Sequence, residues 1–235
     1  LSDNMISLLS STIKEVSINK SIKVIVIAAT GKIFCSGHNL KEITAARENN
    51  DQGERYFKDL FESCSSLMQS IVNCSKPVIA EIDGIATAAG CQLVASCDLA
   101  IASDSSSFAT PGVNLGLFCS TPMVALSRNV KKKDAMKMLL TGDMIDSSEA
   151  KRISLINDHV PSENLSTEVM QLANKIASKS MQTVKIGKSA FYKQAELSLS
   201  EAYKYTSEIM AENTMNADAK EGISSFLEKR DPKWE

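Results

Sequence analysis

The sequence predicts an α/β fold in which a mixed core is followed by a helical tail. Two short apolar segments rich in β-branched residues, 22–29 and 78–82, each lead into a glycine-containing turn and then into a helical pattern. Strands and helices that alternate in this way are typical of an α/β core. Beyond residue 123 helical patterns dominate, so the second part of the chain is expected to be mainly helical.

The first third of the chain contains two helices and one strand by its hydrophobic spacing. Apolar residues recur at three and four across 3–17 and predict a first helix with Asp3 as its N-cap. Segment 22–29 is almost entirely apolar, which is typical of a strand covered on both faces. The polar stretch 45–53 predicts a mobile loop, and the spacing over 56–72 predicts a long helix with a wide apolar face.

Shorter elements follow. Pro77 ends the long helix, and the apolar run 78–82 predicts a second strand. A short helix over 88–96 and strands over 98–103 and near 107–110 continue the alternation. Further helices are expected over 123–128, 131–140, 147–152, 165–178, 184–194 and 202–213.

Composition narrows the class of protein. A chain of 235 residues can bury a core without help from a disulfide or a metal ion. Its 26 basic and 28 acidic residues nearly balance, which argues against a nucleic-acid or membrane-surface partner and favours a small molecule or another protein. No apolar run reaches the ~18 residues of a membrane helix.

The six cysteines predict reduced, mostly buried thiols. They occur at irregular spacings within apolar or small-residue stretches, without a CxxC motif, and only two histidines accompany them. We therefore expect an intracellular compartment and no metal site. Among the other polar residues, Asp98 and Asp104 flank a strand and are expected to be turn or cap residues, and His159 is expected to be structural.

Two segments carry the strongest functional signal. Residues 34–42 (FCSGHNLKE) and 83–92 (DGIATAAGCQ) both place glycine and small residues where a helix is expected to begin. The first N–H groups of a helix have no intrahelical acceptor, so they can point at a ligand. Together the two segments predict an oxyanion hole, which is a pair of N–H donors that hold a carbonyl oxygen as it becomes negative.

The same segments resemble the crotonase (enoyl-CoA hydratase/isomerase) superfamily. The resemblance extends along nearly the whole chain, because 97–103, 108–111, 141–150 and 221–232 also resemble segments of that family in the same order. It implies that the two N–H donors to a thioester carbonyl are those of His38 and Ala89. It also implies an acyl-CoA ligand, with coenzyme A as part of the substrate and no separate cofactor.

The resemblance further implies an architecture. We expect a core of β-β-α spiral turns over 1–161 and a C-terminal helical region over 162–235 that makes the contacts of a homotrimer, with trimers able to pair into hexamers. Family members have two more strands ahead of the position of Leu1, so those N-terminal strands are expected to be missing here. We expect a mitochondrial protein of fatty-acid or related acyl-CoA metabolism, with no nucleic-acid partner and no membrane span.

The chemistry expected of a hydratase lacks its usual acid and base. Family hydratases use two glutamates, which this sequence replaces with Gln92 and Gly112. An amide has no accessible pKa and glycine has no side chain, while general acid–base catalysis supplies about 10²-fold to 10⁴-fold per group. Ordinary hydratase activity is therefore not expected, although the main-chain donors of the oxyanion hole tolerate these side-chain changes.

Two classes of function remain open. In one, the chain is a catalytically silent acyl-CoA-binding subunit. In the other, it is an enzyme that uses His38 with the oxyanion hole as a decarboxylase, a thioesterase or a weak hydratase or isomerase. Cys119 is a further candidate, either as a thiol made reactive by a helix N-terminus or as a buried, inert one.

The coenzyme is expected to lie against the first loop. By resemblance, main-chain groups of Ser36, His38 and Leu40 hold the adenine, with Lys41 close by. Lys229 is expected to reach the phosphates from a neighbouring subunit or from the C-terminal helix, because lysine suits phosphate as a point charge.

Overall fold

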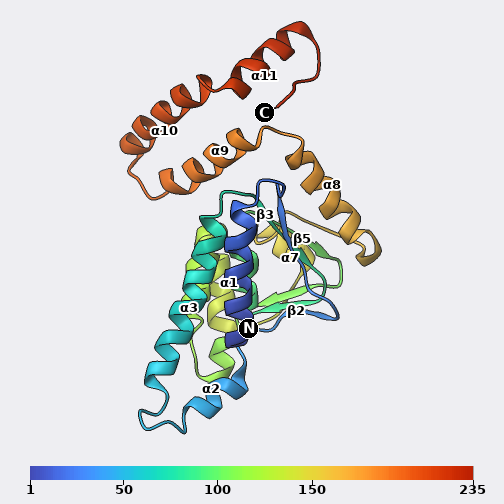
Figure 1. Ribbon diagram of the computed structural model, residues 1–235. Helices are drawn as coiled ribbons and strands as arrows, with labels where there is room; N and C mark the ends of the chain where they lie inside the picture. The colour runs from blue at the N-terminus through green and yellow to red at the C-terminus, as the bar shows by residue number, and fades with distance from the viewer. Residues whose placement is uncertain (235) are drawn as a thin grey trace.

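The computed structural model describes residues 1–234 and is built around two four-stranded sheets (Figure 1). The first sheet, in the order β1-β3-β5-β8, is parallel and consists of β1 (Ile25–Ile27), β3 (Val78–Ile82), β5 (Leu99–Ser103) and β8 (Asp158–Val160). The second, in the order β2-β4-β6-β7, consists of β2 (Ile33–Cys35), β4 (Ile85–Thr87), β6 (Ser107–Ala109) and the antiparallel β7 (Ile145–Asp146). The pairs β1-β2, β3-β4 and β5-β6 each give one strand to each sheet, which confirms the expected spiral of β-β-α turns.

The hydrophobic spacing left out four strands, which are β2, β4 and β7 of the second sheet and β8 of the first. β2, β4 and β7 have three residues or fewer, and so does β8 of the first sheet, so no alternation can develop along them. β1 is also shorter than the expected 22–29. Ile25 and Ile27 pack against one core cluster and Val26 against the other, so both faces of the strand are covered, as expected, although its residues are only half-buried at the edge of the sheet.

Helices enclose one side of these sheets. α1 (Asp3–Ile18) packs along α3 (Glu54–Val72), and the short α2 (Leu40–Ala46) precedes α3 in the chain. The buried α4 (Ala89–Ser96) lies against α3 and α5 (Ser120–Asn129). The remaining core helices are α6 (Lys132–Thr141) and α7 (Ser147–Arg152), with the short 3-10 helices η1 (Pro111–Leu115) and η2 (Ser162–Asn164).

The cap of α1 differs from the expected one. The Ser2 side chain accepts a hydrogen bond from the Met5 N–H at 3.2 Å, so Ser2 is the N-cap and Asp3 is the first helical residue. The expectation for Asp3 was therefore wrong by one position. The reason is geometric, since a cap side chain must come from the extended residue immediately before the helix.

The last four helices divide into one that covers a sheet and three that stand apart. α8 (Leu165–Ala177) covers the first sheet and buries Leu165 and Val169 against Ile79 and Ile101. α9 (Met181–Gln194), α10 (Leu199–Thr214) and α11 (Ala217–Glu228) extend away from the core (Figure 1). The division of the chain at residue 161 stays a prediction, and α8 beyond it belongs spatially with the sheets.

A buried ion pair joins α9 to the core. Lys188 Nζ lies 2.6 Å from Asp98 Oδ2 and also donates to the carbonyls of Ile71 and Lys76. The other oxygen of Asp98 accepts from Tyr192 at 2.9 Å. Asp98 is therefore more than the turn residue expected from the sequence, because it also links strand, loop and α9.

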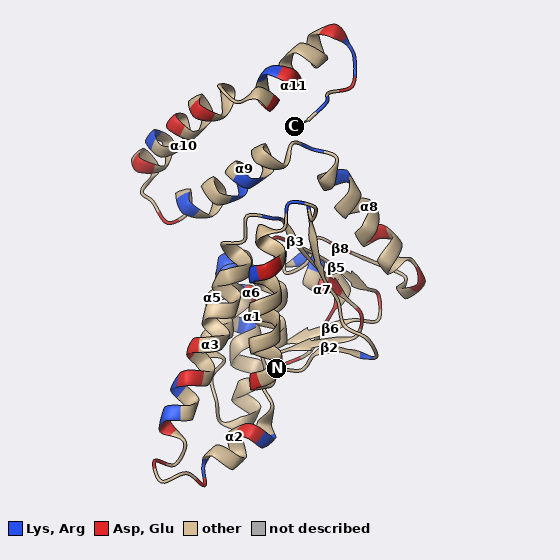
Figure 2. Cartoon of the chain, viewed as in Figure 1, with Lys and Arg blue, Asp and Glu red and all other residues tan. Residues whose placement is uncertain are grey.

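The surface carries both signs of charge. Figure 2 shows acidic and basic residues mixed along α3 and α10, which follows from the near balance of the composition. No helix within residues 1–234 is both long and apolar enough to span a bilayer. All six cysteines are free thiols and five of them are buried, as expected.

Candidate functional site

The two predicted loops meet at Gly37 and Ala88. Gly37 has a φ of 105°, and a Cβ atom added to it would lie 2.9 Å from the Ala88 Cβ. On the other side of the contact, a Cβ on Gly90 would lie 1.9 Å from the carbonyl oxygen of Cys35. Only glycine allows the backbones to approach so closely at these two positions. Gly37 and Gly90 thus allow the two loops to pack directly against each other.

Both loops present backbone N–H groups that have no acceptor within the described chain. The neighbouring N–H groups of Asn39 and Ala88 donate to the carbonyls of Leu1 and Ala109, both at 3.0 Å, but those of His38 and Ala89 do not donate to any described residue. Ala89 is the first residue of α4, so its N–H has no intrahelical partner. The N–H groups of His38 and Ala89, which the sequence predicts as donors, are therefore free to bind a ligand, and their role as an oxyanion hole stays a prediction.

Backbone strain precedes the second donor. Ala88 has a φ of 51° and a ψ of −119°, a conformation that costs a non-glycine residue of order 1–3 kcal/mol. Its N–H is tied to Ala109 and its methyl group lies against Gly37. The surrounding contacts therefore hold Ala88 in a strained shape that starts α4 abruptly at Ala89.

The His38 residue is half-buried, and one of its ring nitrogens is fully buried. Its ring meets Phe61 edge-on with 5.6 Å between centroids, and its Nδ1 is buried without a hydrogen-bond partner in the described chain. Burial lowers the pKa of His38 below its ordinary value, so the ring is neutral near pH 7. A neutral imidazole can exchange a proton with a ligand.

Gln92 lies within α4 and is 4% exposed. Its Oε1 is buried and has no hydrogen-bond partner among residues 1–234. Thr110, at the end of β6, is fully buried, and its Oγ1 is equally unpartnered. Sequence reasoning did not single out Thr110, and its position between a strand and Pro111 was the only signal available.

Cys119 occupies the space beside Gly112. A Cβ on Gly112 would lie 2.9 Å from Cys119 Sγ and 2.7 Å from the carbonyl oxygen of Leu117. The Gly112 N–H donates to the sulfur at 3.3 Å. Burial raises the pKa of this thiol, which favours the buried, inert thiol over the alternative of a thiol activated by the helix N-terminus.

The expected coenzyme residues separate into two groups. Ser36, Leu40 and Lys41 are exposed on the first loop and the start of α2. Lys229 ends α11 in a left-handed conformation. In Figure 1 α11 lies at the far end of the molecule from the N-terminus, and Leu1 contacts Gly37. Lys229 is therefore not brought to the loops of its own chain.

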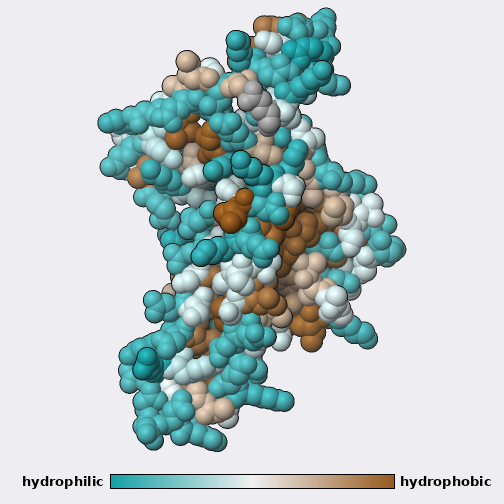
Figure 3. Space-filling view, viewed as in Figure 1, coloured by the Kyte–Doolittle hydropathy of each residue, from teal (hydrophilic) through white to brown (hydrophobic). Residues whose placement is uncertain are grey.

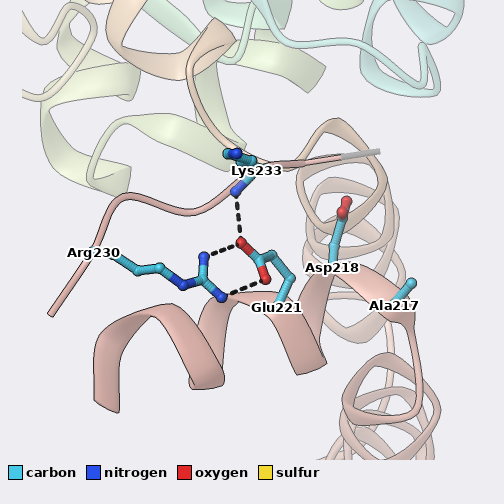
Figure 4. Close-up of a pocket in the computed structure, with 5 residues that line it drawn as sticks. All are labelled: Ala217, Asp218, Glu221, Arg230 and Lys233. Carbon is cyan, nitrogen blue, oxygen red and sulfur yellow. Dashed lines mark hydrogen bonds and ion pairs between the residues drawn. The ribbon is translucent and has the colours of Figure 1, made fainter. Parts of the chain in front are cut away.

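A pocket at the C-terminal end is lined by Glu221, whose carboxylate is hydrogen-bonded to other residues of the same pocket. Figure 4 shows Glu221 accepting two hydrogen bonds from Arg230, at 2.5 and 2.9 Å, and one from the Lys233 N–H. These contacts, the Arg230 guanidinium first, lower the pKa of Glu221 to about 2. Among residues 1–234, no three His, Cys, Asp or Glu side chains gather in a way that could hold a metal ion.

Comparison with known proteins places this geometry in a family. The sequence model of the enoyl-CoA hydratase/isomerase family matches residues 1–235. The chain belongs to this family. It is 50% identical over 234 residues to enoyl-CoA hydratase domain-containing protein 3, mitochondrial, of Xenopus laevis, covering all of this chain and 78% of the relative. The human protein of the same name is also 50% identical, with 76% of its length covered.

Solved structures of proteins from this family have the same fold as this chain. The crystal structure of human enoyl-CoA hydratase domain-containing protein 3 has a TM-score of 0.94 at 50% identity, with 100% of this chain and 90% of the other covered. An enoyl-CoA hydratase of Mycobacterium smegmatis has a TM-score of 0.95 at 44% identity, with 100% and 89% covered. These likenesses confirm the predicted fold and the predicted family. The names of the curated relatives agree with the expected mitochondrial localisation.

Proposed function

We propose that this chain binds acyl-CoA thioesters, with the N–H groups of His38 and Ala89 as the oxyanion hole. The observation that carries the proposal is the pair of unpaired N–H groups on two loops that pack together at Gly37 and Ala88. Donors fixed in this way need no rearrangement to receive a carbonyl oxygen. The names of the relatives support coenzyme A thioesters as the ligand class.

Hydration of enoyl-CoA at ordinary rates does not fit this site. Gln92 cannot transfer a proton near neutral pH, and Gly112 has no group that could. The space around the Gly112 Cα is filled by Cys119 and the Leu117 carbonyl, so it is no open cavity left behind by a glutamate. Two missing groups remove about 10⁴-fold or more, and we expect crotonyl-CoA hydration below about one part in 10⁴ of an active family member.

The coenzyme would lie along the first loop. Ser36, Leu40 and Lys41 are exposed there, so they are accessible to the adenine and its phosphates. Lys229 would come from a second copy of the chain, since its own α11 lies away from its loops (Figure 1). An ammonium group suits a phosphate as a point charge.

Self-association of the C-terminal helices supports this arrangement. Large apolar side chains on α9–α11 are exposed: Phe191, Leu199, Tyr203, Met210, Met215, Ile223, Phe226 and Leu227. Figure 3 shows apolar surface over these helices and in the hollowed middle of the molecule. Exposed apolar patches of this kind mark protein interfaces. We propose homotrimers, which can pair into hexamers, and light scattering on purified protein measures the mass directly.

A second candidate function rests on His38. The neutral ring of His38 has an Nδ1 without a hydrogen-bond partner among the described residues, and the backbone N–H of His38 is one of the two proposed donors. This arrangement could support decarboxylation or thioester hydrolysis, since neither reaction needs the glutamate pair. His38→Ala keeps the backbone donor, so loss of a measured turnover without loss of binding would assign catalysis to the imidazole.

Binding of matched ligands tests the main proposal. Titration calorimetry with butyryl-CoA and with S-butyl-CoA, a thioether that lacks the carbonyl, isolates the contribution of the oxyanion hole. Two hydrogen bonds of about 0.5–1.5 kcal/mol each predict roughly 5-fold to 150-fold tighter binding of the thioester. Equal affinities would overturn the oxyanion hole. Hydration of crotonyl-CoA at ordinary family rates would overturn the loss of hydratase chemistry.

A further inference from the structure

The N–H of the proposed donor His38 belongs to the same peptide group as the carbonyl of Gly37. This peptide is trans, so its carbonyl oxygen and its N–H point in opposite directions and turn together. The Leu1 nitrogen donates a hydrogen bond to the Gly37 oxygen, and the Asn39 N–H donates to the Leu1 oxygen at 3.0 Å. Leu1 therefore holds both peptide groups that flank His38, and one of them carries the donor itself.

The second proposed donor is held in the same way from within its own helix. The Ala88 carbonyl shares a peptide group with the Ala89 N–H, and it accepts the N–H of Gln92 in α4 at 3.0 Å. A hydrogen bond to the carbonyl of a peptide group also polarises its N–H, which strengthens the N–H as a donor. His38 precedes α2 and has no such helical bond behind it, so the segment that begins at Leu1 takes this role.

Two side chains from other helices hold the first turn of α1 beside the first loop. The Asp3 N–H donates to Glu42 Oε2 at 3.1 Å, and Glu42 lies on α2. The Asp3 carboxylate accepts a hydrogen bond from the hydroxyl of Tyr56, on α3, at 3.2 Å. Because α2 continues directly from the first loop, the bond between Asp3 and Glu42 fixes where residues 1–3 lie along residues 37–42.

We propose that residues 1–3 form a clamp on the first loop and that Glu42 is the positioning residue of this clamp. By accepting the Asp3 N–H, Glu42 keeps Leu1 on the Gly37 carbonyl and so orients the His38 N–H toward the thioester oxygen. The inference rests on the proposed oxyanion hole and adds a residue that acts on it through the backbone. Loss of the Glu42 carboxylate therefore weakens the contact with the ligand carbonyl specifically.

The ratio of two affinities tests the clamp. Titration calorimetry on the full chain compares butyryl-CoA with S-butyl-CoA, which carry the same coenzyme and differ in the carbonyl. An effect of a substitution on the fold or on coenzyme binding changes both affinities and cancels in their ratio. Glu42→Met keeps the length of the side chain and removes the acceptor. We expect it to lower the thioester preference of the wild type by about 2-fold to 10-fold, the effect of one hydrogen bond.

Matched variants assign the loss to the hydrogen bond. Glu42→Gln keeps an acceptor oxygen at the end of the side chain and should retain the preference. Glu48→Met, in the exposed turn that follows α2, is the control for the same change of residue type and should also retain it. Tyr56→Phe removes only the hydroxyl that binds Asp3. It should lower the preference less than Glu42→Met does, and it gives a second route if Glu42→Met does not fold.

The outcomes separate the two levels of inference. A wild type that binds both ligands equally overturns the oxyanion hole and the clamp with it. If the wild type prefers the thioester and Glu42→Met keeps the full preference, the clamp is wrong and the oxyanion hole stands. Equal weakening of both ligands in Glu42→Met also overturns the clamp, because Glu42 then serves only the fold or the coenzyme. A loss in Glu42→Gln as large as in Glu42→Met would assign the effect to charge and overturn the hydrogen-bonded clamp.

Discussion

Gly37 and Ala88, 51 positions apart in the sequence, pack so closely that a methyl group on Gly37 would lie 2.9 Å from the Ala88 Cβ. Gly37 has a φ of 105° and Ala88 a φ of 51°. Each residue immediately precedes one of the two proposed N–H donors, His38 and Ala89. This contact therefore sets the relative placement of the donors, and changes at it should affect binding more than remote changes of the same chemistry.

Gly37→Ala should weaken both the fold and thioester binding. Positive φ costs a non-glycine residue about 1–2 kcal/mol, and overpacking against Ala88 adds about 1–3 kcal/mol. Gly31→Ala is the matched control, since Gly31 has a φ of 95° and no atom near its Cβ position. Urea unfolding and butyryl-CoA affinity should fall further for Gly37→Ala than for Gly31→Ala. Equal losses would show that backbone strain alone matters.

Lys188→Met should destabilise the chain strongly. The ammonium group is 2.6 Å from Asp98 Oδ2, and the two side chains are only 8% and 16% exposed. Removing one partner of a buried pair costs about 3–5 kcal/mol, because the other charge stays buried and unpaired. Lys185→Met, on the exposed face of the same helix, should cost much less.

The double variant Lys188→Met with Asp98→Asn measures the interaction energy between the two side chains. Because the uncompensated charge is gone, it should lose less free energy of unfolding than the sum of the two single changes. Chemical denaturation of all four proteins measures the coupling. Strict additivity would contradict a direct interaction between Lys188 and Asp98.

Acidification should destabilise the chain through His38. Burial holds the pKa of His38 below its ordinary value of about 6.5, so below that pH the unfolded chain binds more protons than the folded one. The free energy of unfolding then falls as the pH falls, by at most about 1.4 kcal/mol per pH unit from this group. Above about pH 7 the contribution is constant.

Comparison of His38→Gln with wild type isolates the contribution of His38 to the pH dependence of stability. Urea unfolding at pH 7 and pH 5 should show a smaller loss for His38→Gln, because glutamine does not titrate. His159→Gln serves as the control, since it leaves His38 in place and removes the histidine paired with Asp104. Parallel losses in wild type and His38→Gln would refute the role of His38.

Gly112→Glu should be poorly tolerated. The first side-chain carbon alone would approach the Leu117 carbonyl at 2.7 Å and Cys119 Sγ at 2.9 Å, and overpacking typically costs about 1–3 kcal/mol. Asn114→Glu, exposed on the same short helix η1, is the control. Adding Cys119→Ala to Gly112→Glu should recover part of the loss in thermal unfolding. No recovery would show that the backbone carbonyl, rather than the thiol, prevents the substitution.

Much of the fold was readable because long helices repeat a pattern. The apolar spacing that predicts 56–72 and 165–178 matches α3 and α8 to within two residues at each end. β2, β4 and β7 were not predicted, since two or three residues cannot show an alternation and pairing between distant strands forms them. The ion pair of Lys188 with Asp98 joins residues 90 positions apart, and no local sequence pattern predicts it.

The sequence by itself determined which backbone groups could serve as donors. The glycines in the two loops, and the presence of Gln92 and Gly112 where the resemblance expects glutamates, are facts of residue type, and the sequence also identifies the family. Only the tertiary structure decided what surrounds those positions. It leaves Gln92 and Thr110 unpartnered and fills the space beside Gly112 with Cys119. Hydrogen-bond partners and packing volumes depend on segments that folding brings together, and no single stretch of sequence contains them.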